Sequence, residues 1–232
     1  IIVLLNKMTK IAKKLQQITS EIRNAEAYAH RTSHSVQLLA VSKTKPSAAI
    51  IKAYQAGQRH FGESYLQEAL IKQNELANYQ MAWHFIGPIQ SNKTRQIAQH
   101  FSWVHSVDRL KIAMRLSEQR PEHLPPLNIC LQVNISNEAT KSGFQLAELA
   151  EMVTMISQLP NIKLRGVMDI PEPELDFEEQ RQPYHLLYQT VMTLNKPELD
   201  TFSFGMTGNL KAAIVEGATI VRVGTALFGA RN

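Results

Sequence analysis

The sequence predicts an α/β protein, a (β/α)8 TIM barrel with one extra helix at its N-terminal end. Short apolar runs without a helical period alternate about eight times with amphipathic segments, and short turns connect them. The 232 residues are close to the roughly 250 that one such barrel needs. No linker rich in Pro, Gly or Ser marks a second unit, so we expect a single domain over 1–232. An open doubly wound sheet is the alternative, but no GxGxxG motif follows the first apolar run.

The extra helix is expected over residues 8–30. Its apolar residues recur every three to four positions, which is typical of an amphipathic helix; they are Ile11, Leu15, Ile18, Ile22 and Ala25. The preceding run IIVLL is too short to span a membrane and lacks the features of a signal peptide. We therefore interpret residues 1–7 as an N-terminal extension and Met8 as the natural start.

The eight expected strands are the short apolar runs, over residues 37–42, 60–63, 81–87, 103–107, 128–135, 164–170, 201–206 and 219–224. The helices that follow the first seven are expected over residues 46–56, 64–76, 93–100, 108–119, 144–158, 178–194 and 209–216. Pro46 favours a first helical turn, and Gly57 is expected to end the same helix. We expect Ser64 and Asp108 to act as helix N-caps.

Composition excludes several function classes. The formal net charge of +5 comes from Lys and Arg scattered along the helices rather than from a basic run, so nucleic-acid binding is not indicated. The single Cys130 lies in an apolar run, which predicts a buried structural thiol and a reducing, cytoplasmic setting. No His or carboxylate spacing indicates a metal site. We expect a monomer, because no long exposed apolar stripe is evident.

The stretch Gln37–Pro46, QLLAVSKTKP, contains the strongest candidate for chemistry. The apolar run is typical of a strand buried on both faces, and Lys43 follows directly where that strand ends. In α/β barrels, sites lie at the carboxyl ends of the strands. Partial burial there would lower the pKa of the amine, and a neutral amine can attack a carbonyl to form an imine. Considered alone, the stretch also fits an ordinary surface lysine.

Two later segments are expected to bind phosphate. In this architecture the usual phosphate site is formed by the loops after the seventh and eighth strands. Thr207 and the residues after it offer a hydroxyl and helix-start amides, and Gly224 with Thr225 lets backbone N–H groups approach an anion. A lysine across the mouth from a phosphate site indicates a ligand that carries both an aldehyde and a phosphate. Pyridoxal 5'-phosphate (PLP) is such a ligand.

Other polar residues fall at the same expected mouth. His84 lies inside an apolar strand and is interpreted as a core histidine with its hydrogen bonds made, rather than as a general base. Asn134 and Met206 end the fifth and seventh strands. Together with His84 they complete the set of cofactor-binding candidates. Glu63 is interpreted as a helix cap, although it could orient Lys43.

Several motifs resemble the pyridoxal-phosphate homeostasis proteins, single-domain relatives of the alanine racemase barrel. In chain order they are VSKTKP, FGESYLQE, WHFIGPIQSNK, KSG and VRVGTALFGAR, and the resemblance extends from about residue 10 onward. It implies a PLP imine on Lys43, with Arg222 facing the pyridine nitrogen. It also implies backbone contacts from Gly224 and Thr225 to the phosphate, and Thr207 in place of a family serine.

The chain departs from the family pattern at four positions near the expected site. Ser64 replaces an Asn, and Asp169 stands where a small residue is common. Asn209 and Leu210 replace an acidic residue and a Met. These departures leave the expected phosphate-binding segments intact. They bear instead on the geometry around the pyridine ring of PLP.

Three function classes remain open at this stage. The first is a protein that holds PLP as a lysine imine, takes part in intracellular PLP homeostasis and hands the cofactor to apo-enzymes, without robust amino-acid turnover. The second is a PLP-dependent amino-acid racemase, which needs a second acid or base that related racemases take from another domain or subunit. The third is a lysine-imine aldolase without the cofactor. We expect the first, because Lys43 lies on the first strand and no second domain is indicated.

Overall fold

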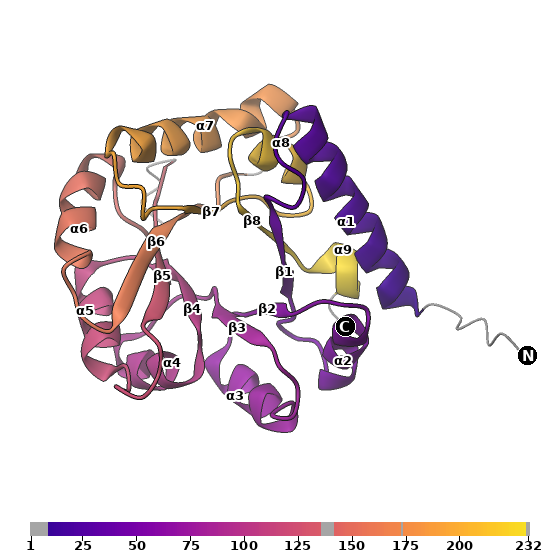
Figure 1. Ribbon diagram of the computed structural model, residues 1–232, viewed down its shortest axis with the longest axis horizontal. Helices are drawn as coiled ribbons and strands as arrows, with labels where there is room; N and C mark the ends of the chain where they lie inside the picture. The colour runs from indigo at the N-terminus through magenta and orange to yellow at the C-terminus, as the bar shows by residue number, and fades with distance from the viewer. Residues whose placement is uncertain (1–8, 136–141, 173, 231–232) are drawn as a thin grey trace, which may run out of the picture.

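The computed structural model describes residues 9–135, 142–172 and 174–230 and shows a closed barrel of eight parallel strands (Figure 1). The strands pair in sequence order, and β8 pairs with β1 to close the sheet. Their bounds are β1 Gln37–Val41, β2 His60–Glu63, β3 Ala82–Phe85, β4 Trp103–Val107, β5 Leu127–Gln132, β6 Ile162–Met168, β7 Thr201–Ser203 and β8 Ile220–Val223. The predicted fold class is confirmed.

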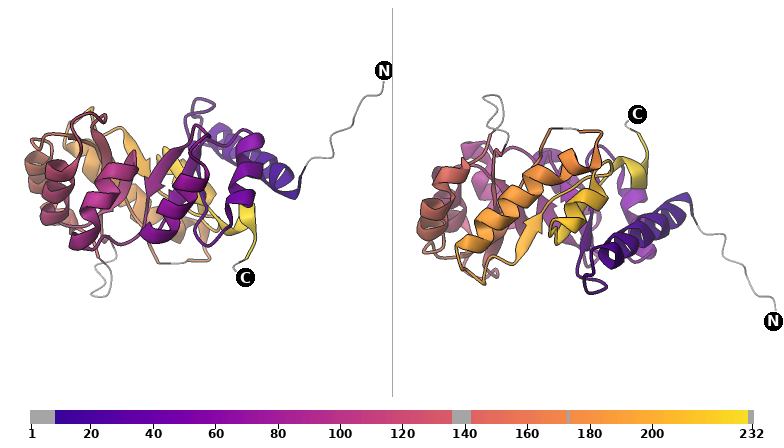
Figure 2. Two further views of the ribbon diagram at one scale, coloured as in Figure 1. Left: turned by 90° about the horizontal axis from the view of Figure 1, so that it is seen from below. Right: turned by 90° about the horizontal axis from the view of Figure 1, so that it is seen from above.

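Helices surround the strands on the outside of the barrel (Figure 1). They are α1 Lys10–Tyr28, α2 Ser47–Gln55, α3 Leu66–Glu75, α4 Thr94–His100, α5 Leu110–Gln119, α6 Leu149–Ile156, α7 Phe177–Thr193, α8 Leu210–Val215 and α9 Thr225–Phe228, with 3-10 turns η1 Ser91–Lys93 and η2 Leu146–Glu148. In the side views α7 crosses the outside of the barrel next to α8 (Figure 2).

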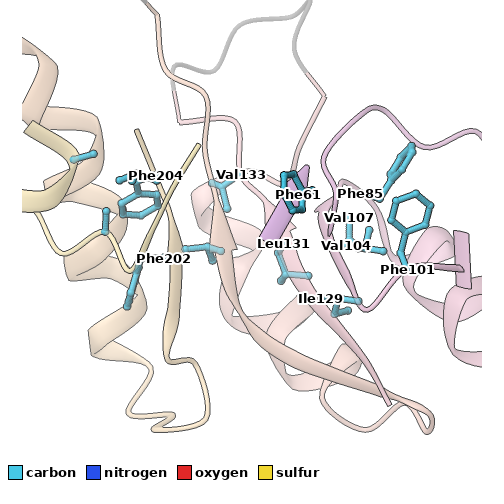
Figure 3. Packing of buried hydrophobic residues seen from close by; sticks show 14 of the residues in the cluster. Phe61, Phe85, Phe101, Val104, Val107, Ile129, Leu131, Val133, Phe202 and Phe204 are labelled. Atoms are coloured by element: carbon cyan, nitrogen blue, oxygen red, sulfur yellow. The ribbon is translucent and has the colours of Figure 1, made fainter. Parts of the chain in front are cut away.

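The main hydrophobic core fills the layer between the strands and these helices. Alternate strand residues point outward into it, because successive side chains of a strand lie on opposite faces. Aromatic and branched side chains such as Phe61, Phe85, Val104 and Phe202 are 4% exposed or less and pack against the helices (Figure 3). The other strand face lines the barrel interior, where polar side chains are placed by the same alternation.

The extra N-terminal helix is present as α1, close to its predicted bounds. Thr9 caps it by accepting a hydrogen bond from the amide of Ala12. Its apolar stripe, including Leu15, Ile18 and Ile22, packs toward α8, α9 and α2 beside the closure of the barrel (Figure 1). The interpretation of residues 1–7 as an extension, and of Met8 as the start, lies outside the described residues, as does Lys141 of the KSG motif.

Two predicted caps are wrong. Helix α3 begins after Tyr65, so Ser64 does not cap it, and α5 begins after Arg109 rather than Asp108. The Asp108 carboxylate instead forms an ion pair with Arg109 at 2.8 Å. The seventh strand also ends at Ser203, three residues earlier than expected, because the chain turns at Gly205 with φ of 81°.

Among the described helices, none combines the length and the apolar character that crossing a lipid bilayer requires.

Candidate functional site

Lys43 lies in the tight turn that leaves the carboxyl end of β1. The Lys45 amide donates to the Ser42 carbonyl oxygen at 3.0 Å, which closes the turn around Lys43. Lys43 is half-buried, between the fully buried Ser42 and the exposed Thr44. Thr44 has φ of 63°, in the left-handed region that β-branched residues rarely adopt. The predicted position of Lys43 at the strand exit is therefore what the structure shows.

Side chains from β2 and α3 clamp both sides of this turn. The buried Lys72 amine donates to the Ser42 carbonyl oxygen at 2.7 Å and to Glu63 Oε1 at 2.8 Å. It also contacts Glu68 Oε1 at 2.5 Å, and that carboxylate accepts from the Thr44 amide at 2.6 Å. The residues immediately before and after Lys43 are thus held by one ionic network.

Glu63 belongs to this clamp and is not the helix cap we expected. Its side chain is fully buried at the end of β2 and accepts from the Ser42 hydroxyl at 2.6 Å. Burial raises the pKa of the Glu63 carboxyl, and the Lys72 ammonium and the Ser42 hydroxyl oppose that change. Sequence reasoning missed Lys72, because a lysine on an amphipathic helix resembles any other solvated charge.

Arg222 lies in β8, the strand next to β1, with Leu39 as its pairing residue. Its side chain is 5% exposed, and burial lowers the pKa of the guanidinium while Tyr184 and Asp169 oppose that change. Its Nη1 donates to the hydroxyl of Ser203 at 2.8 Å and to the carbonyl of the same residue. Its Nη2 donates to the Asp169 carbonyl at 2.8 Å. The guanidinium is therefore a fixed, buried cation.

The two predicted phosphate segments lie at the carboxyl ends of β7 and β8. Gly224 precedes α9 and lies against β1, so a Cβ atom there would be 3.2 Å from the Val41 carbonyl oxygen. Thr225 starts α9 and is exposed. In the β7–α8 loop the Met206 amide donates to Asn209 Oδ1 at 2.8 Å, which fixes the turn that carries the exposed Thr207.

Pairing of β8 with β1 brings the Lys43 turn, Arg222 and Gly224 to the same part of the barrel mouth. Asn134 lines a cavity of about 220 Å³ at the ends of β5 and β6, together with Asp108 and Asp169. Burial raises the pKa of the Asp108 carboxyl, and its ion pair with Arg109 opposes the change.

Thr207 also borders a groove outside the mouth. This groove of about 630 Å³ lies between α1 and the starts of α7 and α8. Its lining includes Tyr28, Phe177 and Lys211, and the Lys211 amine lies 3.9 Å from the Tyr28 ring centroid. Among the described residues no group of three or more His, Cys, Asp or Glu could hold a metal ion.

His84 is buried inside the barrel, as expected, but it is part of a larger polar set that sequence reasoning missed. Its ring contacts His60 at 3.0 Å and His105 at 2.8 Å, and His105 contacts the Ser203 hydroxyl at 2.8 Å. A signal was present, because a polar residue stands between two apolar neighbours in Trp83-His84-Phe85 and in Phe202-Ser203-Phe204, and His105 follows the apolar Val104.

The comparisons with known proteins agree with this architecture. The family model for the alanine racemase N-terminal domain matches residues 14–232. The pyridoxal phosphate homeostasis protein of Pseudomonas aeruginosa is 58% identical and covers 97% of each chain. The chain belongs to the pyridoxal phosphate homeostasis protein family. The member from Escherichia coli K12 is 48% identical over 97% of this chain and 98% of its own.

Two solved structures have folds similar to that of this chain. PipY of Synechococcus elongatus PCC7942, with PLP bound, has a TM-score of 0.83 and 38% identity, over 95% of this chain and 100% of PipY. Alanine racemase from Corynebacterium glutamicum has a TM-score of 0.68 at 16% identity, over 93% of this chain and 62% of the racemase. The second likeness shows that the fold is shared.

Proposed function

We propose that this chain holds PLP covalently through Lys43 and takes part in intracellular PLP homeostasis and delivery. The observation that carries the proposal is the pairing of β8 with β1, which sets the Lys43 turn beside Arg222 and Gly224. The names of its curated relatives, and the PLP bound in PipY, support PLP as the ligand.

The residues present fit this cofactor. Gly224 has no side chain where a Cβ would crowd the β1 backbone, so the amides at the start of α9 can approach a phosphate closely. Thr207 adds a hydroxyl from the neighbouring loop. Arg222 has only hydrogen-bond donors to offer, which suits an unprotonated pyridine nitrogen. The cofactor supplies an aldehyde, with which the Lys43 amine condenses with loss of one water molecule.

We assign this bond to Lys43 rather than to its neighbour Lys45, because Lys43 comes directly after the buried Ser42, whose carbonyl oxygen is held by Lys72. The Lys45 amine lies further along the turn and donates to the Ala230 carbonyl oxygen at 2.5 Å. Borohydride reduction of the PLP-loaded protein, followed by peptide mapping, should place the cofactor mass on Lys43. Mass on Lys45, or none on either lysine, would reject the proposal.

We further propose that amino-acid turnover is not robust. PLP chemistry draws electrons into the ring, and a protonated ring nitrogen strengthens that effect. Arg222 is a fixed cation that does not give up its proton under ordinary conditions, so it would keep the nitrogen unprotonated.

The alternative function is a PLP-dependent amino-acid racemase. L-Alanine and other amino acids incubated with loaded protein in deuterated water separate the two functions. We expect negligible exchange at Cα and no D-isomer. Rapid exchange that disappears in Lys43→Met would replace the carrier proposal with the racemase.

Delivery is the remaining part of the proposal. We propose apo-PLP enzymes as acceptors, a monomeric carrier and a cytoplasmic location, which the buried single Cys130 supports. Mixing the loaded protein with an apo-enzyme should restore that enzyme's activity faster than the same amount of free PLP added together with the Lys43→Met variant. Equal rates would reject direct transfer.

A further inference from the structure

A row of polar side chains crosses the inside of the barrel and ends at Arg222. Successive contacts join His60 to His84, His84 to His105, His105 to Ser203 and Ser203 to Arg222, all between 2.8 and 3.0 Å. His105 belongs to β4 and Ser203 to β7, which are not neighbours in the sheet. Their contact therefore passes through the barrel interior.

The two central histidines are neutral. His84 and His105 are fully buried, and burial lowers the pKa of each ring, that of His105 to about 3. Each neutral ring has one N–H donor and one bare nitrogen acceptor. Each contact in the row must then pair one donor with one acceptor. The direction of the hydrogen bond at one end therefore determines which nitrogen carries the hydrogen in every other ring.

Ser203 determines the direction of the hydrogen bonds in the row. Its hydroxyl oxygen accepts from Arg222 Nη1, because a guanidinium has donors only. Within the described part of the chain its other hydrogen-bonding side-chain neighbour is His105 Nδ1. If His105 donated there, the hydroxyl hydrogen would have no acceptor among the side chains that the described residues place beside it. The Ser203 hydroxyl therefore donates to His105 Nδ1.

The remaining hydrogens follow in order. His105 carries its hydrogen on Nε2 and donates to His84 Nδ1, and His84 donates from Nε2 to His60 Nδ1. His60 is the half-buried end of the row. Each bare nitrogen thus points toward Arg222, so the aligned dipoles present their negative ends to the buried cation.

Packing holds the rings in this orientation. The Trp103 ring stacks on His84 with an angle of 8° between the planes and 5.5 Å between the centroids. At the other end, Arg222 Nη1 donates twice to Ser203, and Nη2 donates to the Asp169 carbonyl. The plane of the guanidinium is thereby fixed by the last residue of β7 and by the residue that follows β6.

We propose that Ser203, His105, His84 and His60 form a one-way hydrogen-bond chain that positions Arg222 and stabilises its charge inside the barrel. We assign these four residues a positioning role, because the row reaches the candidate site through Arg222. The value of a fixed Arg222 for PLP rests on the proposed function, whereas the direction of the chain does not.

The test of direction uses ligand-free protein. Long-range nitrogen NMR of labelled histidines at pH 7 should show His84 and His105 with hydrogen on Nε2 and bare Nδ1. A ring with hydrogen on Nδ1, or a doubly protonated ring, overturns the chain. In Ser203→Ala both rings should become mixed in tautomer together, and Ser203→Thr, which keeps the hydroxyl, should restore the pattern. Unchanged histidine spectra in a folded Ser203→Ala protein also overturn it.

The test of positioning uses PLP-loaded protein. We expect Ser203→Ala to lose bound PLP about tenfold faster than the parent, and Ser203→Thr to retain it, because one hydrogen bond to a charged group is removed. Equal retention in all three overturns the positioning role. A parent protein that binds no PLP rejects the proposed function instead, and the NMR experiment still decides the chain.

Discussion

The Lys72 amine lies 2.7 Å from the carbonyl oxygen of Ser42, the residue immediately before Lys43. A buried ammonium has three hydrogens to satisfy, and this one uses them on Ser42, Glu63 and Glu68. The helix α3 is thereby fastened to the turn that carries the candidate cofactor lysine. Lys72 contributes to the site through backbone geometry rather than through contact with a ligand.

Lys72→Met should strongly destabilise the protein, because it leaves the buried Glu63 carboxylate without its cation. Removing one member of a buried ion pair costs about 3–5 kcal/mol. Urea unfolding followed by circular dichroism measures the free energy of unfolding. Adding Glu63→Gln should recover part of the loss, since the buried charge is then gone.

The matched control for this experiment is Lys111→Met, on the exposed face of α5. It should change the free energy of unfolding by no more than about 0.5 kcal/mol. Similar losses of unfolding free energy in Lys72→Met and Lys111→Met would contradict a stabilising role for the contacts of Lys72 with Ser42, Glu63 and Glu68.

Thr44→Asn should stabilise the ligand-free protein. Thr44 has φ of 63°, and a β-branched residue in that region is strained, whereas Asn adopts it readily. We expect a gain of about 1 kcal/mol in the free energy of unfolding. Thr154→Asn in α6 has no such strain to relieve and should give no gain. If Thr44→Asn lowers the free energy of unfolding as much as Thr154→Asn does, the turn is not strained.

Gly87→Ala should destabilise the turn after β3. A Cβ at Gly87 would lie 2.2 Å from the Ser64 carbonyl oxygen, and backbone atoms cannot move aside without shifting a whole segment. We expect a loss of about 3 kcal/mol or more, as for other overpacked sites. Gly208→Ala has nothing within 4 Å of the added atom and serves as the control in thermal unfolding. Equal melting temperatures for the two variants would be inconsistent with this close approach.

Stability should fall on acidification because His84 and His105 are buried and neutral. Burial lowers the pKa of both rings in the folded protein, that of His105 to about 3. The unfolded chain takes up these protons below pH about 6.5, so it binds more protons than the folded chain there. The free energy of unfolding should then drop by about 1.4 kcal/mol per pH unit for each histidine between about pH 6 and pH 4.

The pH slope can be assigned by substitution. His105→Gln should remove one histidine's share of the slope, whatever its effect on stability at pH 7. His123→Gln, at an exposed position between α5 and β5, should leave the slope unchanged. An unaltered slope in His105→Gln would count against a neutral buried ring.

Much of the fold could be predicted because strand and helix patterns are local. The run ending at Val41 is apolar throughout, as a strand buried on both faces must be, and Lys43 follows it directly. The positions of the two segments proposed to bind phosphate, after β7 and β8, could be predicted from the order of the strands alone. The prediction of Ser64 and Asp108 as N-caps was wrong, because the presence of a capping residue type does not determine on which residue a helix begins.

The parts that could not be predicted depend on contacts between distant segments. Ser203 meets His105 only because β4 and β7 face each other across a closed barrel, and strand patterns do not reveal which inward residues meet. Lys72 resembles a solvated helix residue until α3 is packed against the Lys43 turn. Long-range packing therefore determined the residues that support the site.

Closure of the barrel by β8 against β1 also has a consequence during synthesis. Until residue 223 has been added, β1 lacks one of its two neighbouring strands and presents an open edge. At the usual pace of translation, the ribosome needs on the order of 10 to 40 s to go from residue 43 to residue 225. The lysine and the segment proposed to hold the phosphate are therefore made at opposite ends of this interval, and a nascent chain has no complete place for the cofactor until the last strand leaves the ribosome.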